Sequence, residues 1–299
     1  MNKRRIALLL SIGGAVALGI APRAASVPPP DEVATVSFLE GRAWIRPPNA
    51  KVRKELELFD WIKIGSLIDT ETDARIIVAF ASGTRYELKG PFAATVEADG
   101  FKTSAKAATK LPPVAVMPRF AALVLDNKSG SRMAGIRLRS APRSVSDLYP
   151  GDGDAVPADQ AVISFGLFPD VGKYRVEVED DAGNDVYSAV TPGSPVVLPL
   201  GILKPGRVYY LSVRTLETKR VSARADTIFA VITEEQAGLR EALKLQADQS
   251  KGAADRLLLA QLEMTLGLQK EACASLKSAL VLQPENAAIR RILAQWGCR

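Results

Sequence analysis

The chain alternates apolar and polar positions over most of residues 33 to 98. In the stretch GSLIDTETDARIIVAFASGTRYELKG, residues 65–90, the alternation runs to Ser82-Gly83, turns there and resumes. Such runs, separated by glycine, proline or asparagine turns, are typical of β-strands joined by hairpins. The pattern predicts an all-β domain over residues 33–100.

A second series of strand patterns falls within residues 130–231. The runs are GIRLRSAPRS (135–144), AVISFGLFP (161–169), GKYRVEVEDDAGNDVYSAVTPG (172–193) and LKPGRVYYLSVRTL (203–216). Their spacing is typical of a two-sheet sandwich of the immunoglobulin or fibronectin type. Tyr210 resembles the strand tyrosine of fibronectin type III-like modules. Residues 101–129, rich in small and basic residues around a double proline, are expected to form an inter-domain crossing.

From residue 233 to 299 the period becomes helical. Thr233 and Gln236 form a capping-box pattern, and four helices are expected at 234–248, 253–266, 269–282 and 285–297. The small residues Ala260, Gly267, Ala272 and Ala279 resemble those of a tetratricopeptide repeat, although Glu263 stands where that repeat has an aromatic residue. The expected fold is therefore multi-domain, with a mainly β N-terminal two thirds and a tetratricopeptide-like helical end.

The first 26 residues have the pattern of an export signal. Lys3, Arg4 and Arg5 precede the apolar run 6–20, and small residues at 24–26 predict cleavage between Ser26 and Val27. The run is shorter than a typical membrane span, but an uncleaved anchor is the alternative. Residues 27–32 are a proline-rich leader.

Removing the signal changes the charge of the chain. The formal net charge is +6 and the pI about 9.3, but Lys3, Arg4, Arg5 and Arg23 leave with the signal, so the mature chain is close to +2. Nucleic acid is therefore not an expected partner. Segment 101–145 still holds nine basic residues against Asp126 alone, which predicts either solvated loops or contact with an anionic surface.

The chain has no histidine, which excludes Ser-His-Asp and Cys-His catalysis and most zinc sites. No catalytic residue, metal ligand or cofactor is predicted, and the spacing of Asp152, Asp154 and Asp159 fails the calcium-loop pattern. Cys273 and Cys298 lie at ends of helices that antiparallel packing brings together, so a disulfide is expected; free or intermolecular thiols are the alternative.

Trp44, Arg75 and Arg85 are the candidate ligand contacts of the first domain. A tryptophan in a strand stacks on a sugar or peptide, or belongs to the core. The two arginines flank the hairpin on its expected wet face, where they either bind an anionic group or are simply solvated.

The first domain resembles the bacterial FecR domain. The resemblance rests on Val36 to Trp44 (VSFLEGRAW), Ile64 to Thr70 (IGSLIDT) and the hairpin from Asp73 to Leu88. It implies a location outside the cytoplasmic membrane. The founding members also signal to a sigma factor through a cytoplasmic arm, but here only a short basic stub precedes the apolar run.

These observations favour a non-enzymatic, exported cell-envelope protein that binds or scaffolds an envelope protein, peptidoglycan or another envelope polymer. The expected location is the periplasm, either free or anchored to the inner membrane by an uncleaved signal. One alternative is a periplasmic signalling relay related to FecR regulators. The other is a carboxylate-dependent glycan hydrolase, which needs two carboxyl groups about 5–10 Å apart in one cleft.

Overall fold

The computed structural model describes most of the chain beyond the expected signal and leader. The residues described are 31–103, 108–129, 145–159, 161–169, 171–216 and 223–298, with the side chains of 125–129 excepted. The expected signal, its cleavage site at Ser26 and Val27, and the expected strand at 135–144 lie outside this range. Among the described residues no helix has the length and apolar character that crossing a membrane requires.

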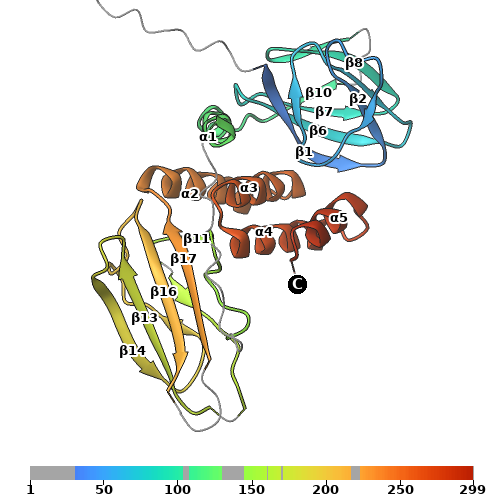
Figure 1. Ribbon diagram of the computed structural model, residues 1–299. Coiled ribbons are helices and arrows are strands. Elements are labelled where there is room, and N and C mark those ends of the chain that lie inside the picture. The colour runs from blue at the N-terminus through green and yellow to red at the C-terminus, as the bar shows by residue number, and fades with distance from the viewer. Residues whose placement is uncertain are drawn as a thin grey trace, which may run out of the picture. The chain divides into compact units, whose positions relative to one another are not determined.

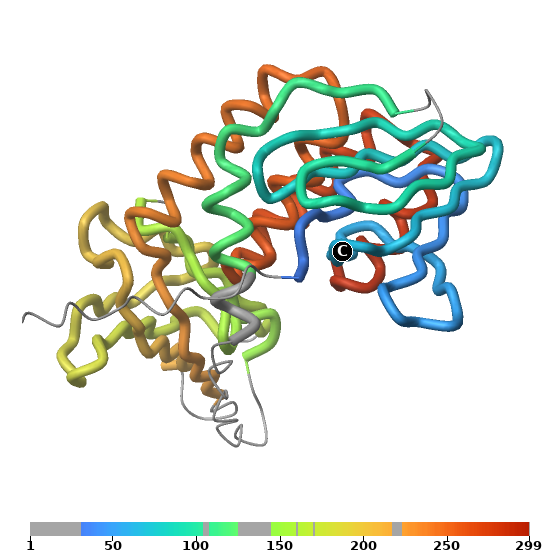
Figure 2. Tube along the Cα trace, turned by 90° about the horizontal axis from the view of Figure 1, so that it is seen from above, coloured from blue at the N-terminus to red at the C-terminus, as the bar shows by residue number. Residues whose placement is uncertain are grey.

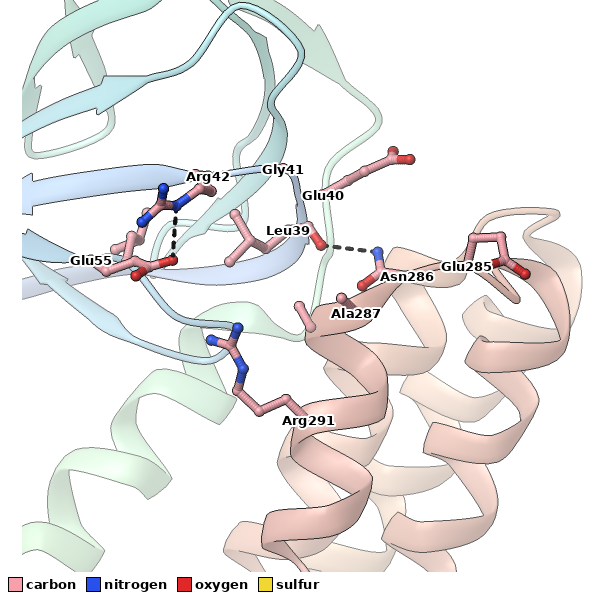
Figure 3. A pocket seen from close by; sticks show the side chains of 11 residues that line it. Leu39, Glu40, Gly41, Arg42, Glu55, Glu285, Asn286, Ala287 and Arg291 are labelled. Carbon is pink, nitrogen blue, oxygen red and sulfur yellow. Dashed lines mark hydrogen bonds and ion pairs between the residues drawn. The ribbon is translucent and has the colours of Figure 1, made fainter.

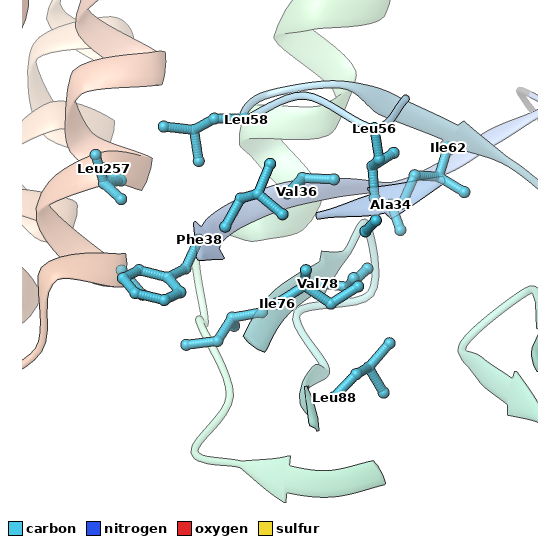
Figure 4. Close-up of a cluster of buried hydrophobic side chains, with 14 of the residues drawn as sticks. Ala34, Val36, Phe38, Leu56, Leu58, Ile62, Ile76, Val78, Leu88 and Leu257 are labelled. Carbon is cyan, nitrogen blue, oxygen red and sulfur yellow. The ribbon is translucent and has the colours of Figure 1, made fainter. Parts of the chain in front are cut away.

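The N-terminal β-domain consists of two five-stranded antiparallel sheets that share a core (Figure 1). The first, named sheet A, has the order β10-β7-β6-β1-β4, and the second, sheet B, has the order β3-β2-β5-β8-β9. Inward-facing Val36, Ile76 and Val78 of sheet A lie together in the core (Figure 4). Ile45 and Ile68 of sheet B belong to the same core. The strands are β1 (Glu32–Glu40), β2 (Ala43–Arg46), β3 (Lys54–Glu55), β4 (Trp61–Lys63), β5 (Leu67–Thr70), β6 (Arg75–Phe80), β7 (Arg85–Lys89), β8 (Phe92–Glu97), β9 (Gly100–Lys102) and β10 (Ala108–Leu111).

The predicted hairpin is β6–β7, but both of its faces are covered. Gly83 makes the turn at φ +97°, and a Cβ there would lie 2.7 Å from the Val114 carbonyl oxygen, so only glycine fits. On the face away from sheet B, Ile77 and Ala79 are also buried, at 5% and 0% exposure. Strict alternation predicts that one face of the hairpin is exposed to solvent. In the structure helices pack on that face, so both faces are buried.

Segment 101–129 differs from the expected crossing. Strand β10 completes sheet A by pairing with β7, and helix α1 (Met117–Ser129) follows the double proline. Met117, Phe120, Ala121 and Val124 are buried, at the three- and four-residue spacing of an amphipathic helix. The prolines precede the helix instead of breaking it, which is where helices tolerate them.

The second β-region contains a five-stranded sheet of order β11-β17-β16-β13-β14 and the two-stranded pair β12–β15. The expected hairpin 172–193 forms β13 and β14, and 203–216 includes β16. Val176 and Val178 of β13 and Val213 of β16 are completely buried in its core. The strands are β11 (Ala155–Val156), β12 (Val162–Ile163), β13 (Tyr174–Asp180), β14 (Asp185–Thr191), β15 (Val196–Val197), β16 (Val208–Thr215) and β17 (Arg224–Val231).

The buried tyrosine of β16 is Tyr209, whereas Tyr210, which resembles the strand tyrosine of fibronectin type III-like modules, is exposed. The Tyr209 hydroxyl accepts a hydrogen bond from the Lys204 backbone N–H at 2.8 Å, and its side chain is 2% exposed. Tyr210 is 44% exposed on the opposite face. In YYL the two tyrosines occupy opposite faces of one strand, and the sequence alone does not tell which is buried.

The chain ends in four helices, in agreement with the helical pattern. They are α2 (Glu234–Gln249), α3 (Ala253–Thr265), α4 (Gln269–Leu282) and α5 (Ala287–Gln295). The predicted capping box is present, with Thr233 accepting from the Gln236 N–H and Gln236 from the Thr233 N–H. The predicted disulfide Cys273–Cys298 is also present, with 5.3 Å between the Cα atoms.

Helix α3 lies against sheet A and is buried on almost every side. Leu257 of α3 lies beside Phe38 of β1 in Figure 4, and in Figure 2 the C-terminal helices run beside the N-terminal strands. The helical end contacts both β-regions. It touches the second β-region, where Ala155 donates its N–H to the Gly267 carbonyl, but it shares its core with the first β-domain.

An ion pair is buried where sheet A meets α3. Arg85 Nη1 lies 2.6 Å from Asp255 Oδ1, and both side chains are 7% exposed. Arg85 Nε donates to the Pro112 carbonyl at 2.8 Å, and Gln246 donates to the same Asp255 oxygen. Both charges are therefore desolvated and hydrogen-bonded, so each depends on the other.

Replacing Arg85 by methionine is expected to destabilise the protein by about 3–5 kcal/mol, because Asp255 would be left buried and uncompensated. The double variant Arg85→Met/Asp255→Leu is expected to lose less than Arg85→Met alone, because neither charge remains. Urea unfolding measures both. The exposed Arg207→Met is the control, with about 0–1 kcal/mol expected. If the single and double variants lose equal free energy of unfolding, the uncompensated charge of Asp255 is not the cause of the destabilisation.

Candidate functional site

A cleft of about 490 Å³ opens where the β1–β2 turn meets the start of α5 (Figure 3). Two smaller hollows, each about 370 Å³, lie between α1 and α2 and on the outer face of β13, β16 and β17. The first cleft is the largest of the three and joins elements far apart in sequence. Its lining residues are Leu39, Glu40, Gly41, Arg42, Glu55, Leu56, Glu285, Asn286, Ala287, Ala288 and Arg291.

Asn286 holds the two walls of the cleft together. Its Oδ1 accepts the Ile289 N–H at 3.1 Å, which caps α5, and its Nδ2 donates to the Leu39 carbonyl at 2.9 Å. The residue is 5% exposed, so both contacts are shielded from water. Because one side chain satisfies groups on both elements, the cleft has a defined shape without a ligand.

The β1–β2 turn is fixed from the other side as well. Gly41 has φ +74°, and a Cβ at this position would lie 2.8 Å from the Ala74 Cα. Any other residue would clash with backbone, so the turn needs glycine. The turn sets the direction in which Glu40 and Arg42 leave the strand ends.

The rim of the cleft carries charges of both signs. Arg42 pairs with Glu55 at 3.7 Å, and Glu285 pairs with Arg290 at 3.2 Å. Glu40 and Arg291 form no ion pair with any residue that the structure describes. Their charges remain available to a ligand.

Trp44 lies next to this cleft on sheet B, where two arginines surround it. The Arg53 and Arg42 guanidinium carbons are 4.5 Å and 5.4 Å from the ring centroid. These are cation–π contacts that the side chain makes within the chain, and the residue is only partly buried. The structure thus brings Trp44 near the rim but leaves Arg75 and Arg85 away from the cleft lining.

Arg75 is engaged within the β-domain. Its Nε lies 2.5 Å from Glu87 Oε1, and its guanidinium lies 4.9 Å from the Phe38 ring centroid. Burial alone would raise the pKa of Glu87, but the Arg75 hydrogen bond and charge, with help from Lys89, bring that pKa below its usual value. Arg75 therefore stabilises a buried carboxylate.

Arg85 is not on a wet face, contrary to the expectation. It is buried against Asp255, and a ligand could reach it only if α3 moved away. The alternation of β7 indicates the face of the strand on which Arg85 lies, but the helix that covers this face is 170 residues away.

The disulfide stabilises the far end of α5. Cys298 follows this helix, and the bond ties it to Cys273 on α4. Trp296 stacks on Phe59 of the β-domain at 5.4 Å between ring centroids, and its carbonyl accepts from Gln269 Nε2 at 3.0 Å. Asn286 and the disulfide therefore fix the two ends of the helix that forms one wall of the cleft.

Within the part of the chain that the structure describes, the remaining candidates add no second site. Asp154 accepts the Gly151 N–H at 2.7 Å, and within the described ranges no group of three or more Cys, Asp or Glu side chains could hold a metal ion. In the basic segment 101–145, Lys102, Lys110 and Arg119 are described, whereas Lys106 and residues 130–144 lie outside. Contact with an anionic surface stays a prediction.

Sequence reasoning missed Asn286, Glu40 and Arg291. Asn286 follows Pro284-Glu285, an ordinary helix N-cap pattern, so its role as the cap of α5 can be recognised from the sequence. Its second partner, Leu39, is 247 residues away. No local pattern reports such a contact.

No protein-family model matches the chain, and no curated protein matches it. Similar solved structures include CopC from Methylosinus trichosporium OB3b, at 18% identity over 30% of this chain and 94% of that one, TM-score 0.25. A two-domain fibronectin type III segment of chicken tenascin is 14% identical over 66% of this chain and 83% of that one, with TM-score 0.21. The FN1–FN3 domains of chicken CNTN1 are 9% identical over 67% of this chain and 54% of that one, with TM-score 0.23. Similarities this weak assign neither a family nor a function.

Asn286→Ala is expected to cost about 2–4 kcal/mol, the sum of a lost cap and an unsatisfied Leu39 carbonyl. Asn286→Ser keeps a capping oxygen but lacks the donor to Leu39, so its loss is expected to be smaller. Urea unfolding gives both values, and hydrogen exchange at residues 39–42 reports on the turn. Unchanged exchange in both variants would contradict the role of Asn286 as a clamp.

Arg75→Gln is expected to destabilise the protein at pH 7 by about 1 kcal/mol, because Arg75 is partly exposed. The folded-state pKa of Glu87 lies below its unfolded value, so this stabilisation exists above the unfolded pKa of about 4.3 and is lost as the pH falls through the folded pKa. Unfolding of both proteins from pH 7 to about pH 3 should show the difference shrinking. A constant difference would assign Arg75 to packing on Phe38 alone.

Proposed function

We propose that this chain is a non-enzymatic, exported binding or scaffold protein of the cell envelope, and that the cleft beside Asn286 is its recognition site. The observation that carries the proposal is this preformed cleft, with unpaired charges on its rim and rigid elements on both walls. Binding sites on rigid supports lose little entropy when a ligand enters. The expected partner is an envelope protein, peptidoglycan or another envelope polymer.

Three finer assignments belong to the same proposal. The first β-domain is related to FecR domains, the second β-region to fibronectin type III or immunoglobulin modules, and the helical end to tetratricopeptide repeats. The disulfide supports an oxidising compartment, and the periplasm fits both it and the FecR resemblance. Export would proceed through the N-terminal signal.

The chemistry of the cleft supports binding over catalysis. Glu55 and Glu285 are paired with arginines, and the chain has no histidine to act as a general base. Glycan hydrolysis needs one carboxylic acid and one carboxylate on either side of a bond. Of the three carboxylates on this rim, two are paired with arginines and all three are exposed, which does not resemble that arrangement.

The contact between α3 and sheet A determines how the proposal can be tested. Removing the helical end would expose the apolar face of sheet A and leave Arg85 without Asp255. A chain truncated in this way would then bind other proteins nonspecifically through the exposed apolar face. The full mature chain from Val27, altered only at exposed rim charges, avoids this problem.

The mature chain should sediment with purified peptidoglycan sacculi or with envelope proteins immobilised on beads. Arg291→Glu and Glu40→Arg are expected to reduce the bound fraction, because each reverses an unpaired rim charge. Arg207→Glu, directly before β16 and outside the cleft lining, is the control and should bind normally. Equal binding by the wild type and all three variants would show that the cleft is not the recognition site. Release of soluble glycan fragments would favour the hydrolase instead.

A further inference from the structure

The floor of the cleft is apolar and fixed in place. Leu39 and Leu56 are 5% and 1% exposed, and Ala287 and Ala288 bring methyl groups to its edge. The Leu39 carbonyl is held by Asn286, so the floor cannot turn its backbone acceptor toward a ligand. Such a floor accepts small apolar side chains.

The charged groups on the two sides of this floor differ. In Figure 3 the guanidinium groups of Arg42 and Arg291 lie on one side of the cleft, together with Glu55. Glu40 and Glu285 extend on the other side. One side of the cleft therefore carries two guanidinium groups and one carboxylate, and the other side carries carboxylates alone.

These charges are free or weakly held. Glu40 and Arg291 have no ion-pair partner in the described part of the chain, and Glu285 is 93% exposed despite its contact with Arg290. The Arg42–Glu55 pair is long, at 3.7 Å, and both side chains are largely exposed. Exposed pairs of this kind are worth about 0–1 kcal/mol, so a ligand can replace them.

The balance of charge argues against a polyanion. Three carboxylates and two guanidinium groups line the cleft, so a chain of phosphates or uronates would meet more repulsion than attraction. A fully apolar ligand would leave the rim charges uncompensated. A ligand with one charge of each sign, separated by a small apolar body, satisfies both walls and the floor.

We propose that the cleft binds a short zwitterionic peptide. The ammonium group of the peptide lies toward Glu40 and Glu285, and its carboxylate lies toward Arg42 and Arg291. Its small side chains rest on the accessible methyl groups of Ala287 and Ala288. This inference rests on the proposed function and names the ligand of its site. The chemistry is shared by ends of ordinary proteins and by cell-wall peptides that contain D-alanine.

Titration calorimetry of the mature full-length chain with alanine tripeptides tests this. L-Ala-L-Ala-L-Ala is compared with its N-acetylated form, its C-terminal amide and L-Ala-D-Ala-D-Ala. Each blocked form should bind roughly tenfold more weakly, the loss expected for one charge-assisted contact. Preference for the D-alanine peptide would identify cell-wall peptides as the source, and preference for the all-L peptide would identify protein ends.

Matched variants connect each end of the peptide to one wall. The Arg291→Gln variant should bind the free peptide about tenfold more weakly than the wild type does, and should bind the free peptide and its C-terminal amide equally. In Glu40→Gln, acetylation should lose its effect instead. Arg207→Gln, which removes an exposed charge elsewhere, should behave as wild type, and circular dichroism confirms that all variants fold.

Two results would overturn the inference. One is no binding of any tripeptide at millimolar concentration, and the other is equal affinity for free and blocked peptides. If sacculi or envelope proteins still bind in a cleft-dependent manner, the proposed function survives and only the ligand class is wrong. If neither these fractions nor the peptides bind, both proposals fail.

Discussion

The arrangement of the described residues depends on the ion pair between Arg85 and Asp255. Two charges at 7% exposure lose most of their hydration, and only their mutual contact and additional hydrogen bonds offset that loss. Arg85 also donates to the Pro112 carbonyl and Asp255 accepts from Gln246. Sheet A, the segment before α1, α2 and α3 therefore meet at one point. A relative shift of any of them would strand a buried charge.

The other polar groups of α3 have the same effect on a smaller scale. Gln261 donates to Thr35 of β1 at 3.0 Å, and Glu263 accepts from Arg240 of α2 at 2.9 Å and from Ser275 of α4. Burial raises the pKa of Glu263, although Ser275 and Arg240 lower it in part. Each unsatisfied group would cost about 1–3 kcal/mol, so α3 tolerates only one packing against its neighbours. Apolar contacts bring these elements together, and polar contacts select their register.

Local patterns were sufficient for much of the fold. The hairpin at Ser82-Gly83, the capping box at Thr233 and the pairing of Cys273 with Cys298 each depend on short spacings or on neighbouring helices. Helix α1 had a readable pattern as well, but the double proline before it favoured a linker. The sequence does not show which distant segment of the chain packs on a given strand. Arg85 occupies a polar position in an alternating strand, and nothing nearby shows that Asp255 covers it.

The same long-range contacts explain why the candidate site was not visible in the sequence. Glu40 and Arg291 are ordinary exposed residues in their own segments, and they line one cleft only because Asn286 joins the β1–β2 turn to α5. The surface of α3, which a helical repeat could offer to a partner, is instead used by sheet A. The open cleft therefore lies at the seam between the β-domain and the helices, and not on the face of α3. A seam of this kind changes whenever either element moves, so ligand binding there would also strengthen the contact between the two.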